Sequence, residues 1–247
     1  MPPDLTGKVA IVTGASRGIG FAIAQALVEC GADIMMCGRT TDVVHAATKR
    51  VADRLGQTAG TLAAGRIEAV AADVRSPEHA ARLVDAATAR FGGLDILVNN
   101  AGVGGFTAVA EQSVDEWRQI IDTNLNGPFY CARAAIPALR RRGGGWIINI
   151  SSLAGTHPFA RAAAYCASKA GLNAFSEALM QEVRYDGIRV ATVAPGSVET
   201  EFMGEAGAGA DWKLTPDDVA QVVLDLLGHD KRSLPSLVEL RPSRPRK

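Results

Sequence analysis

The stretch Lys8-Val-Ala-Ile-Val-Thr-Gly-Ala-Ser-Arg-Gly-Ile-Gly20 decides the fold of this chain. Its first half is a short, β-branched apolar run, which is typical of a strand buried on both faces. Its second half holds three glycines, and an apolar pattern that predicts a helix follows from Phe21 to Val28. Because glycines let the backbone approach a pyrophosphate and a helix N-terminus stabilises its charge, this order predicts a dinucleotide-binding unit.

Strand and helix patterns alternate along the rest of the chain. The strands are expected at 8–13, 32–37, 66–72, 94–98, 145–151, 188–194 and 235–240, and the helices near 18–30, 41–55, 77–91, 113–141, 162–185 and 216–228. This alternation predicts an α/β fold: a Rossmann-type, doubly wound parallel sheet of seven strands with helices on both faces. No linker or repeat divides the chain, so residues 1–247 are expected to form one dinucleotide-binding and catalytic domain.

A second informative stretch is Tyr165-Cys-Ala-Ser-Lys169. On a helix, residues four apart share one face with their Cβ atoms roughly 5–6 Å apart. A cation about 4 Å from a phenol would lower the phenol's pKa by as much as about 3 units before desolvation is counted. The spacing therefore predicts a tyrosine suited to general acid–base catalysis, although such a pair found alone is more often a surface pair.

Seven motifs occur in a fixed order: Thr13-Gly-Ala-Ser-Arg-Gly-Ile-Gly20, Asp73-Val74, Asn99-Asn-Ala-Gly102, Asn124, Ser152, Tyr165-x-x-x-Lys169 and Pro195-Gly196-x-x-x-Thr200. With them, the sequence resembles the short-chain dehydrogenase/reductase family from about residue 5 to residue 240. The resemblance implies that Ser152 hydrogen-bonds a substrate carbonyl and that Tyr165 protonates it. It also implies that Lys169 holds the nicotinamide ribose. Asn124, in an irregular part of a helix, would hold a water that replaces the proton lost by the tyrosine.

The resemblance further implies which residues bind the cofactor. Asp73 and Val74 would meet the adenine edge, Asn100 would line the cleft, and residues 195–200 would hold the carboxamide. The implied set is Gly14, Ser16, Arg17, Gly18, Ile19, Gly20, Arg39, Asp73, Val74, Asn100, Ala101, Gly102, Tyr165, Lys169, Pro195, Gly196, Val198 and Thr200. No metal-binding residue is expected.

The end of the second predicted strand indicates which nicotinamide cofactor is used. An NAD-preferring site usually carries an acidic residue there that grips the ribose 2′-hydroxyl, and this chain has Gly38. Arg39 follows at once and Arg17 lies in the glycine loop, and two guanidiniums can hold a 2′-phosphate. The sequence therefore predicts NADP(H), with solvated surface arginines as the alternative.

The predicted reaction is hydride transfer between NADPH and a ketone or aldehyde, and a 3-oxoacyl thioester is one candidate substrate. Many relatives with this motif set reduce 3-oxoacyl thioesters on acyl carrier protein, and Arg140–Arg142 could dock an acidic carrier. The ending Leu234–Pro242 lacks the glycine-rich pattern common among those reductases. An NAD(P)-linked alcohol dehydrogenase acting oxidatively and a non-catalytic nucleotide-binding redox sensor remain alternatives. A nucleotide-sugar epimerase or dehydratase is disfavoured by the glycine spacing and the short C-terminal region.

Composition limits the partners and the cellular location that can be expected of this chain. The formal net charge is zero, so nothing indicates a nucleic-acid partner. The chain shows neither a signal peptide nor the roughly 20 apolar residues that span a bilayer, so a cytoplasmic protein without a membrane is expected. The four cysteines do not have the spacing of a metal site or of a C-x-x-C redox motif, so they are expected to be reduced packing residues. Cys166 lies beside the tyrosine, but a role as a nucleophile is disfavoured. The resemblance implies a homo-oligomer, a tetramer or a dimer, formed through helices near 113–141 and 162–185.

Three segments invite separate predictions. Residues 197–215 are rich in glycine and alanine and are expected to form a lid over the substrate, where Phe202, Met203 and Trp212, with Phe159 from another loop, could add apolar contacts. Residues 56–65 are expected to be a surface insertion. The proline-rich basic tail at 241–247 is expected to be frayed.

Overall fold

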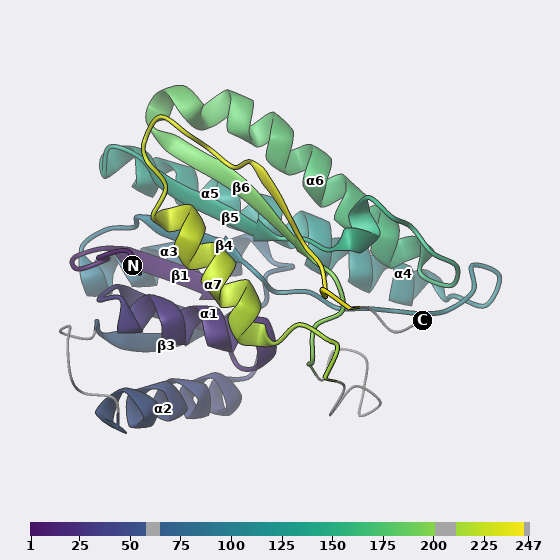
Figure 1. The fold of residues 1–247 in the computed structure, drawn as a ribbon, viewed down its shortest axis with the longest axis horizontal. Coiled ribbons are helices and arrows are strands. Elements are labelled where there is room, and N and C mark those ends of the chain that lie inside the picture. The colour runs from purple at the N-terminus through teal and green to yellow at the C-terminus, as the bar shows by residue number, and fades with distance from the viewer. Residues whose placement is uncertain (58–64, 201–210, 245–247) are drawn as a thin grey trace.

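Seven parallel strands form one sheet in the order β3-β2-β1-β4-β5-β6-β7 (Figure 1). This computed structural model describes residues 1–57, 65–200 and 211–244. The order reverses between β1 and β4, as in a doubly wound sheet, so the predicted fold class is confirmed. The strands are β1 (Val9–Thr13), β2 (Asp33–Gly38), β3 (Ile67–Ala71), β4 (Ile96–Asn99), β5 (Gly145–Ile150), β6 (Ile188–Pro195) and β7 (Leu237–Leu240).

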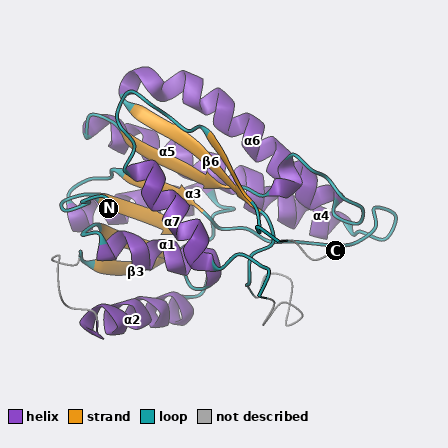
Figure 2. Ribbon diagram, in the orientation of Figure 1, coloured by secondary structure: helices purple, strands orange, loops and turns teal. Residues whose placement is uncertain are grey.

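Helices cover both faces of this sheet (Figure 2). Helices α1, α2 and α7 pack on one face, and α3, α5 and α6 on the other. The predicted helix at 113–141 is interrupted by a five-residue π-helix, so it becomes three elements. The helices are α1 (Gly18–Glu29), α2 (Thr41–Gln57), α3 (Pro77–Phe91), α4 (Val114–Ile121), the π-helix (Asp122–Asn126), α5 (Gly127–Arg141), α6 (Ala163–Val183) and α7 (Pro216–Leu227).

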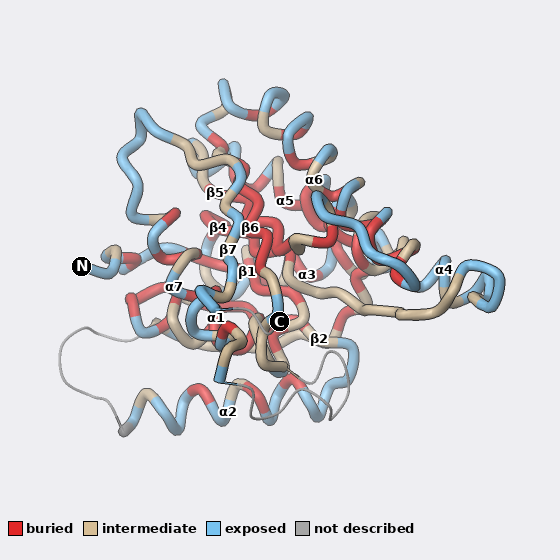
Figure 3. Tube along the Cα trace, turned by 45° about the vertical axis from the view of Figure 1, so that its right-hand side comes forward, coloured by how far each residue is buried: buried red, intermediate tan, exposed pale blue. Residues whose placement is uncertain are grey.

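The core explains why the strands read as continuous apolar runs. Successive side chains of a strand point to opposite faces, and in β1 both faces are covered. Ala10 and Val12 pack in the layer of α1 and α7, whereas Val9 and Ile11 pack in the layer of α3 and α5. Buried residues therefore concentrate along the strands and on one side of each helix (Figure 3).

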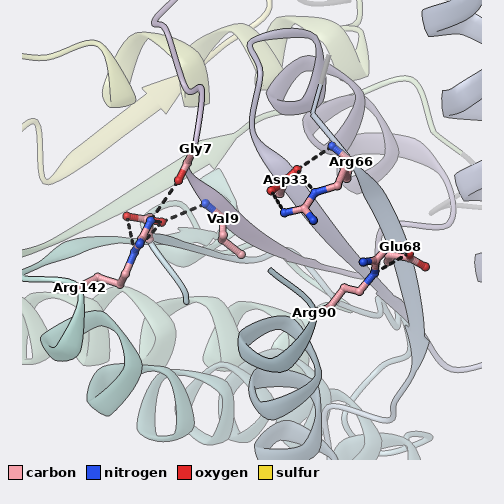
Figure 4. Close-up of polar contacts among 8 residues, drawn as sticks. Gly7, Val9, Asp33, Arg66, Glu68, Arg90 and Arg142 are labelled. Carbon is pink, nitrogen blue, oxygen red and sulfur yellow. Dashed lines mark hydrogen bonds and ion pairs between the residues drawn. The ribbon is translucent and has the colours of Figure 1, made fainter. Parts of the chain in front are cut away.

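Polar contacts join the amino ends of the strands (Figure 4). Asp95, just before β4, accepts hydrogen bonds from the Arg142 guanidinium at 2.8 Å and from the Val9 N–H at 3.0 Å. Arg142 also donates to the Gly7 carbonyl at 3.0 Å. Arg66 pairs with Asp33 at 2.6 Å, so this edge is held by charged groups from several segments.

Parts of the predicted insertion, lid and tail fall on residues 58–64, 201–210 and 245–247, which lie outside the described residues, as do Phe202 and Met203. Within the described residues, no helix combines the length and the apolar character needed to cross a membrane.

Candidate active site

A cleft of about 1090 Å³ opens at the carboxyl ends of the strands, where ligands of doubly wound sheets bind. It extends from the glycine loop after β1 to the loops after β4 and β5. Two of the predicted site residues, Gly20 and Asn124, are not among the described residues that line the cleft. The predicted residues that line it are Gly14, Ser16, Arg17, Gly18, Ile19, Arg39, Asp73, Val74, Asn100, Ala101, Gly102, Ser152, Tyr165, Lys169, Pro195, Gly196, Val198 and Thr200.

The glycine loop needs its glycines for close packing. Gly14 has a φ of 63°, and a Cβ there would lie 2.8 Å from the Cα of Ala101. A Cβ on Gly20 would lie 2.3 Å from Nδ2 of Asn100, which donates to the carbonyls of Thr13 and Gly14 at 2.9 and 3.1 Å. The loop thus holds the N-terminus of α1 at the cleft, and a helix start has N–H groups without intrahelical partners. This cradle fits a pyrophosphate.

Two arginines and one carboxylate line the end of the cleft beside β2. Arg39 follows β2 directly, and Arg17 precedes α1. Asp73 is engaged by Arg75, whose guanidinium lies 2.6 Å from its carboxylate and holds the pKa of that carboxyl below its usual range. Arg39 acts on Asp73 in the same direction. This end of the cleft therefore carries more positive than negative charge among the residues named here.

The segment after β6 lies across the glycine loop. The Gly196 N–H donates to the Leu240 carbonyl at 2.8 Å, which fixes the segment to β7. Val198 forms an isolated bridge with Leu214. A Cβ on Gly18 would lie 3.4 Å from Cγ2 of Thr200, so the two segments face each other. Residues 195–200 thus form a wall of the cleft opposite α1.

Ser152 and Tyr165 meet at the inner part of the cleft. Ser152 caps a short 3₁₀-helix (Leu153–Gly155) by accepting from the Ala154 N–H at 3.1 Å. Its hydroxyl is also hydrogen-bonded to the buried phenol of Tyr165. The neighbouring Ser151 donates instead to Oδ1 of Asn173 at 2.6 Å and is buried. The structure therefore brings Ser152, not Ser151, to the tyrosine, as the family resemblance implies.

The expected lowering of the tyrosine pKa is wrong for this structure. Nζ of Lys169 donates to the Ile150 carbonyl at 2.9 Å and lies 5.9 Å from the centre of the Tyr165 ring. Burial lowers the pKa of Lys169 to about 8, because a charged ammonium loses its hydration there. Burial likewise raises the pKa of Tyr165, and the Ser152 hydrogen bond offsets only part of that rise. Desolvation, rather than mutual attraction, sets both pKa values.

Asn124 is buried in the π-helix, so the helix irregularity implied by the resemblance is present. Its Nδ2 donates to the Val103 carbonyl at 2.9 Å and to Oγ of Ser168 at 3.0 Å, and its Oδ1 accepts from the Val103 N–H at 2.8 Å. Ser168 in turn donates to the Tyr165 carbonyl at 2.7 Å. Asn124 therefore joins the π-helix to the helix that carries the tyrosine. Asn126, by contrast, donates from Nδ2 to Oδ1 of Asp122 within the same π-helix, at 2.8 Å.

Sequence reasoning gave no role to several residues in and beside the cleft. Thr13 accepts from the N–H groups of Asn100 and Ala101 at 3.0 Å each, and its place at a strand end was the available signal. Phe106, His157 and Arg241 line the cleft. Phe106 could have been noticed as a lone aromatic after Gly102-Val-Gly-Gly105. Arg241 was assigned to a frayed tail, but it lies at the cleft and pairs with Glu239 at 2.7 Å.

The four cysteines are buried free thiols. Burial raises the pKa of Cys37 and of Cys131 to about 12, which keeps these thiols protonated and inert as nucleophiles. The described residues hold no group of three or more histidine, cysteine or acidic side chains placed to bind a metal ion.

Comparison with known proteins agrees with this geometry. Residues 8–211 match the family model described as short chain dehydrogenase. The chain belongs to the short-chain dehydrogenase/reductase family. It is 34% identical to an uncharacterized oxidoreductase of Staphylococcus saprophyticus over 97% of this chain and 99% of that one, and 34% identical to an uncharacterized oxidoreductase of Staphylococcus aureus over 96% and 98%.

Solved structures are also similar. A metagenomic short-chain oxidoreductase in complex with NADP superposes with a TM-score of 0.82 and 38% identity, covering 98% of this chain and 100% of that one. An alcohol dehydrogenase from the archaeon Thermococcus sibiricus, complexed with 5-hydroxy-NADP, gives a TM-score of 0.86 and 29% identity, covering 97% and 99%. This chain is thus an oxidoreductase of the family in sequence and in fold.

Proposed function

We propose that this protein is an NADP(H)-dependent oxidoreductase that interconverts a ketone or aldehyde and its alcohol. The observation that carries the proposal is the hydrogen bond between Ser152 and the buried phenol of Tyr165, inside a cleft that the glycine loop also lines. Lys169 lies one helical turn behind the tyrosine, with its ammonium directed at the Ile150 carbonyl. These groups offer a hydrogen-bond donor and a proton source at one point of the cleft.

The choice of NADP(H) rests on charge at the end of the cleft beside β2. Arg17 and Arg39 line this end, and Gly38 stands where a carboxylate would repel a 2′-phosphate. The metagenomic oxidoreductase and the archaeal alcohol dehydrogenase, which are similar to this chain, hold NADP and a hydroxylated NADP. We therefore assign the glycine loop and α1 to the pyrophosphate and the two arginines to the 2′-phosphate.

In the proposed mechanism, NADPH held by the glycine loop and the two arginines would supply the hydride that reduces the carbonyl carbon. Ser152 donates a hydrogen bond to the carbonyl oxygen, where negative charge develops as the C–O π bond breaks. Tyr165 gives its phenolic proton to that oxygen, which completes an alcohol. The protonated Lys169 stabilises the phenolate until a solvent proton replaces the one lost. Each turnover thus consumes one hydride and one proton per carbonyl, and the reverse sequence oxidises an alcohol.

A carrier-bound 3-oxoacyl thioester receives less support. Two arginines of the run at 140–142 are engaged within the protein: Arg140 pairs with Asp186 at 2.7 Å and Arg142 with Asp95 at 2.8 Å. Arg142 lies at the amino edge of the sheet, beside the Gly7 carbonyl (Figure 4), whereas the cleft opens at the carboxyl ends of the strands. We therefore favour a free small-molecule carbonyl compound as the substrate.

The change Tyr165→Phe tests the mechanism. It removes the proton donor and keeps the ring, so kcat should fall by about 10²–10⁴-fold with NADPH binding unchanged. NADPH consumption with a panel of ketones, aldehydes and acetoacetyl thioesters measures kcat, and quenching of protein fluorescence by NADPH measures binding. Substantial turnover by the variant would refute the role of Tyr165. Binding of NADPH without turnover of any substrate by the unaltered protein would favour the redox-sensor alternative.

Domain organisation, location in the cell and assembly complete the proposal. We propose that residues 1–247 work as one domain in the cytoplasm, without a nucleic-acid or membrane partner, which the balanced charge and the four free thiols support. We also propose a homo-oligomer through α4, α5 and α6. Trp117 on α4 and Phe129 on α5 are exposed aromatic side chains, which are enriched at protein interfaces.

A further inference from the structure

We propose that the cleft binds carbonyl compounds bearing a flat aromatic substituent, which stacks on an aromatic shelf formed by Phe106 and Phe159. This inference rests on the proposed function and names the substrate class of the same site. The nicotinamide chemistry requires only a carbonyl, so the substituent must be selected by the side chains around Tyr165. The shelf is an aromatic surface of the cleft that lies next to that residue.

The shelf leads from the mouth of the cleft to the proton donor. The rings of Phe159 and Phe106 are nearly parallel, with an interplanar angle of 17° and centroids 6.1 Å apart. The Phe106 ring lies 6.1 Å from the Tyr165 ring, tilted by 52°. The three rings come from the loop after β4, the loop after β5 and the first turn of α6. All three line the cleft, so a ligand bound at Tyr165 has the shelf beside it.

Burial shows which ring is left for a ligand. Phe106 is partly buried against Ala154, Ala162 and Tyr165, so its place is fixed by packing. Phe159 is 51% exposed, and of the exposed large apolar side chains among the described residues it alone lines the cleft. An exposed aromatic face beside a reaction centre is covered when an apolar ligand binds, and aromatic pairs prefer offset or edge-on contact at these separations.

The charges near the shelf argue against an anionic substrate. Arg241 lines the cleft beside His157, but it pairs with Glu239 at 2.7 Å. Glu239 also accepts from Thr156 at 3.0 Å, which holds this pair to the loop after Ser152. Lys213 and Glu199, which line the cleft too, carry opposite charges. Because these two cations are matched by two carboxylates, they give no net attraction for a carboxylate or a phosphate, so shape and apolar contact decide.

The experiment compares three ketones: 1-phenylethanone, 1-cyclohexylethanone of similar size but without a flat ring, and butan-2-one. NADPH consumption gives kcat/KM for the unaltered protein, Phe159→Ala, Phe159→Leu and the control Tyr185→Ala. Tyr185 is also an exposed aromatic residue, but it lies in the 3₁₀-turn after α6 and outside the lining of the cleft. Circular dichroism and NADPH binding check that each variant is folded.

The unaltered protein should prefer 1-phenylethanone. Phe159→Ala should lower kcat/KM for that ketone by about tenfold and for butan-2-one by less than about threefold, since stacking and apolar contact are both lost. For 1-phenylethanone, kcat/KM of Phe159→Leu should lie between the values of the unaltered protein and of Phe159→Ala, because leucine keeps apolar area but loses the flat face. Tyr185→Ala should leave all three values unchanged.

Two different failures can be told apart. Equal values for the phenyl and cyclohexyl ketones, or an equal loss on all three ketones in Phe159→Ala, would overturn the aromatic shelf while the carbonyl reductase stands. If the folded protein binds NADPH but turns over no ketone, aldehyde or thioester, the proposed function fails, and this inference fails with it. If Phe159→Ala does not fold, the comparison of Phe159→Leu with the unaltered protein decides between the same outcomes.

Discussion

At the scale of single residues, burial governs the chemistry of the Tyr165–Lys169 pair. Spacing alone predicted a phenol made acidic by a neighbouring cation, yet the structure places Nζ of Lys169 on the Ile150 carbonyl. A desolvated phenol is a weaker acid and a desolvated ammonium a stronger one. The pair therefore starts from a neutral tyrosine, which is the form that a reductase needs in order to donate a proton.

The pKa of Lys169 predicts a pH-dependent stability. Its folded-state pKa is about 8 and its ordinary value is 10.5, so between these values the unfolded chain binds more protons than the folded one. The free energy of unfolding should therefore rise with pH in this window, and the full penalty should be present below about pH 8. Relative to Lys169→Met, the unaltered protein should gain about 2–3 kcal/mol from pH 8 to 10.

Urea denaturation of the unaltered protein and of Lys169→Met, at several values across this pH window, measures the difference. The raised pKa of Tyr165 acts in the opposite direction above about pH 10, because the unfolded chain then loses the phenolic proton first. That contribution is present in both proteins and largely cancels. Stability curves that stay parallel from pH 8 to 10 would contradict the depressed pKa of Lys169.

The cofactor preference is also a single-residue property. Arg39 lines the cleft just after β2, and Arg39→Asp replaces a guanidinium with a carboxylate that would repel a 2′-phosphate. The dissociation constant of NADPH should rise by about ten- to a hundredfold, with NADH affected far less. Fluorescence titration with both cofactors measures this change. Arg232→Ala, an exposed arginine outside the described cleft lining, is the control, and an unaltered ratio in Arg39→Asp would exclude the assigned role.

At the scale of elements, the sequence located the seven strands and the helices that cover the sheet, because the central strands β1, β4, β5 and β6 are buried on both faces and read as apolar runs. Apolar periodicity did not locate the π-helix inside 113–141, and only the family resemblance implied an irregular helix at Asn124. Apolar periodicity does not specify which carbonyl an N–H reaches, although Pro128, which lacks that N–H, sits just after the irregularity. Arg241 was misplaced for a similar reason, since its position depends on the pairing of β7 with β6. The depth at which Lys169 lies was equally absent from its spacing to Tyr165.

The π-helix gives an element-scale prediction. Asn124→Ala would leave the Val103 N–H and carbonyl unpaired and would release Ser168, which holds the Tyr165 carbonyl. The free energy of unfolding should fall by about 2–4 kcal/mol and kcat by at least about tenfold. Asn126→Ala is the matched control, because Asn126 bonds Asp122 within the same π-helix and should cost less than about 1 kcal/mol. Denaturation and NADPH consumption measure both effects, and like behaviour of the two variants would refute the positioning role of Asn124.

At the scale of the whole molecule, stability and chemistry are concentrated at opposite edges of the sheet. The carboxyl edge carries the cleft, with Ser152 and Tyr165. The amino edge carries charged pairs that tie the strands together, including Asp95, which is contacted from the start of β1 and from the end of α5 (Figure 4). Parallel strands place all their carboxyl ends at one edge, so this division follows from the topology.

The division predicts that the amino edge can be weakened without loss of catalysis. Arg142→Met removes the guanidinium that contacts Asp95 and the Gly7 carbonyl but keeps much of the apolar stem. Because the Asp95 side chain is only 9% exposed, the loss should lower the free energy of unfolding by about 1–3 kcal/mol. At a temperature well below unfolding, kcat/KM should stay within about twofold of the value for the unaltered protein. Arg232→Met is the control: its pair with Asp230 is exposed at 92% and 60%, and such pairs contribute about 0–1 kcal/mol. Denaturant titration and NADPH consumption separate the two quantities. A fall in kcat/KM that tracks the loss of stability would show that the two edges are coupled through the strands, because distant sites that do not share partners are expected to act independently.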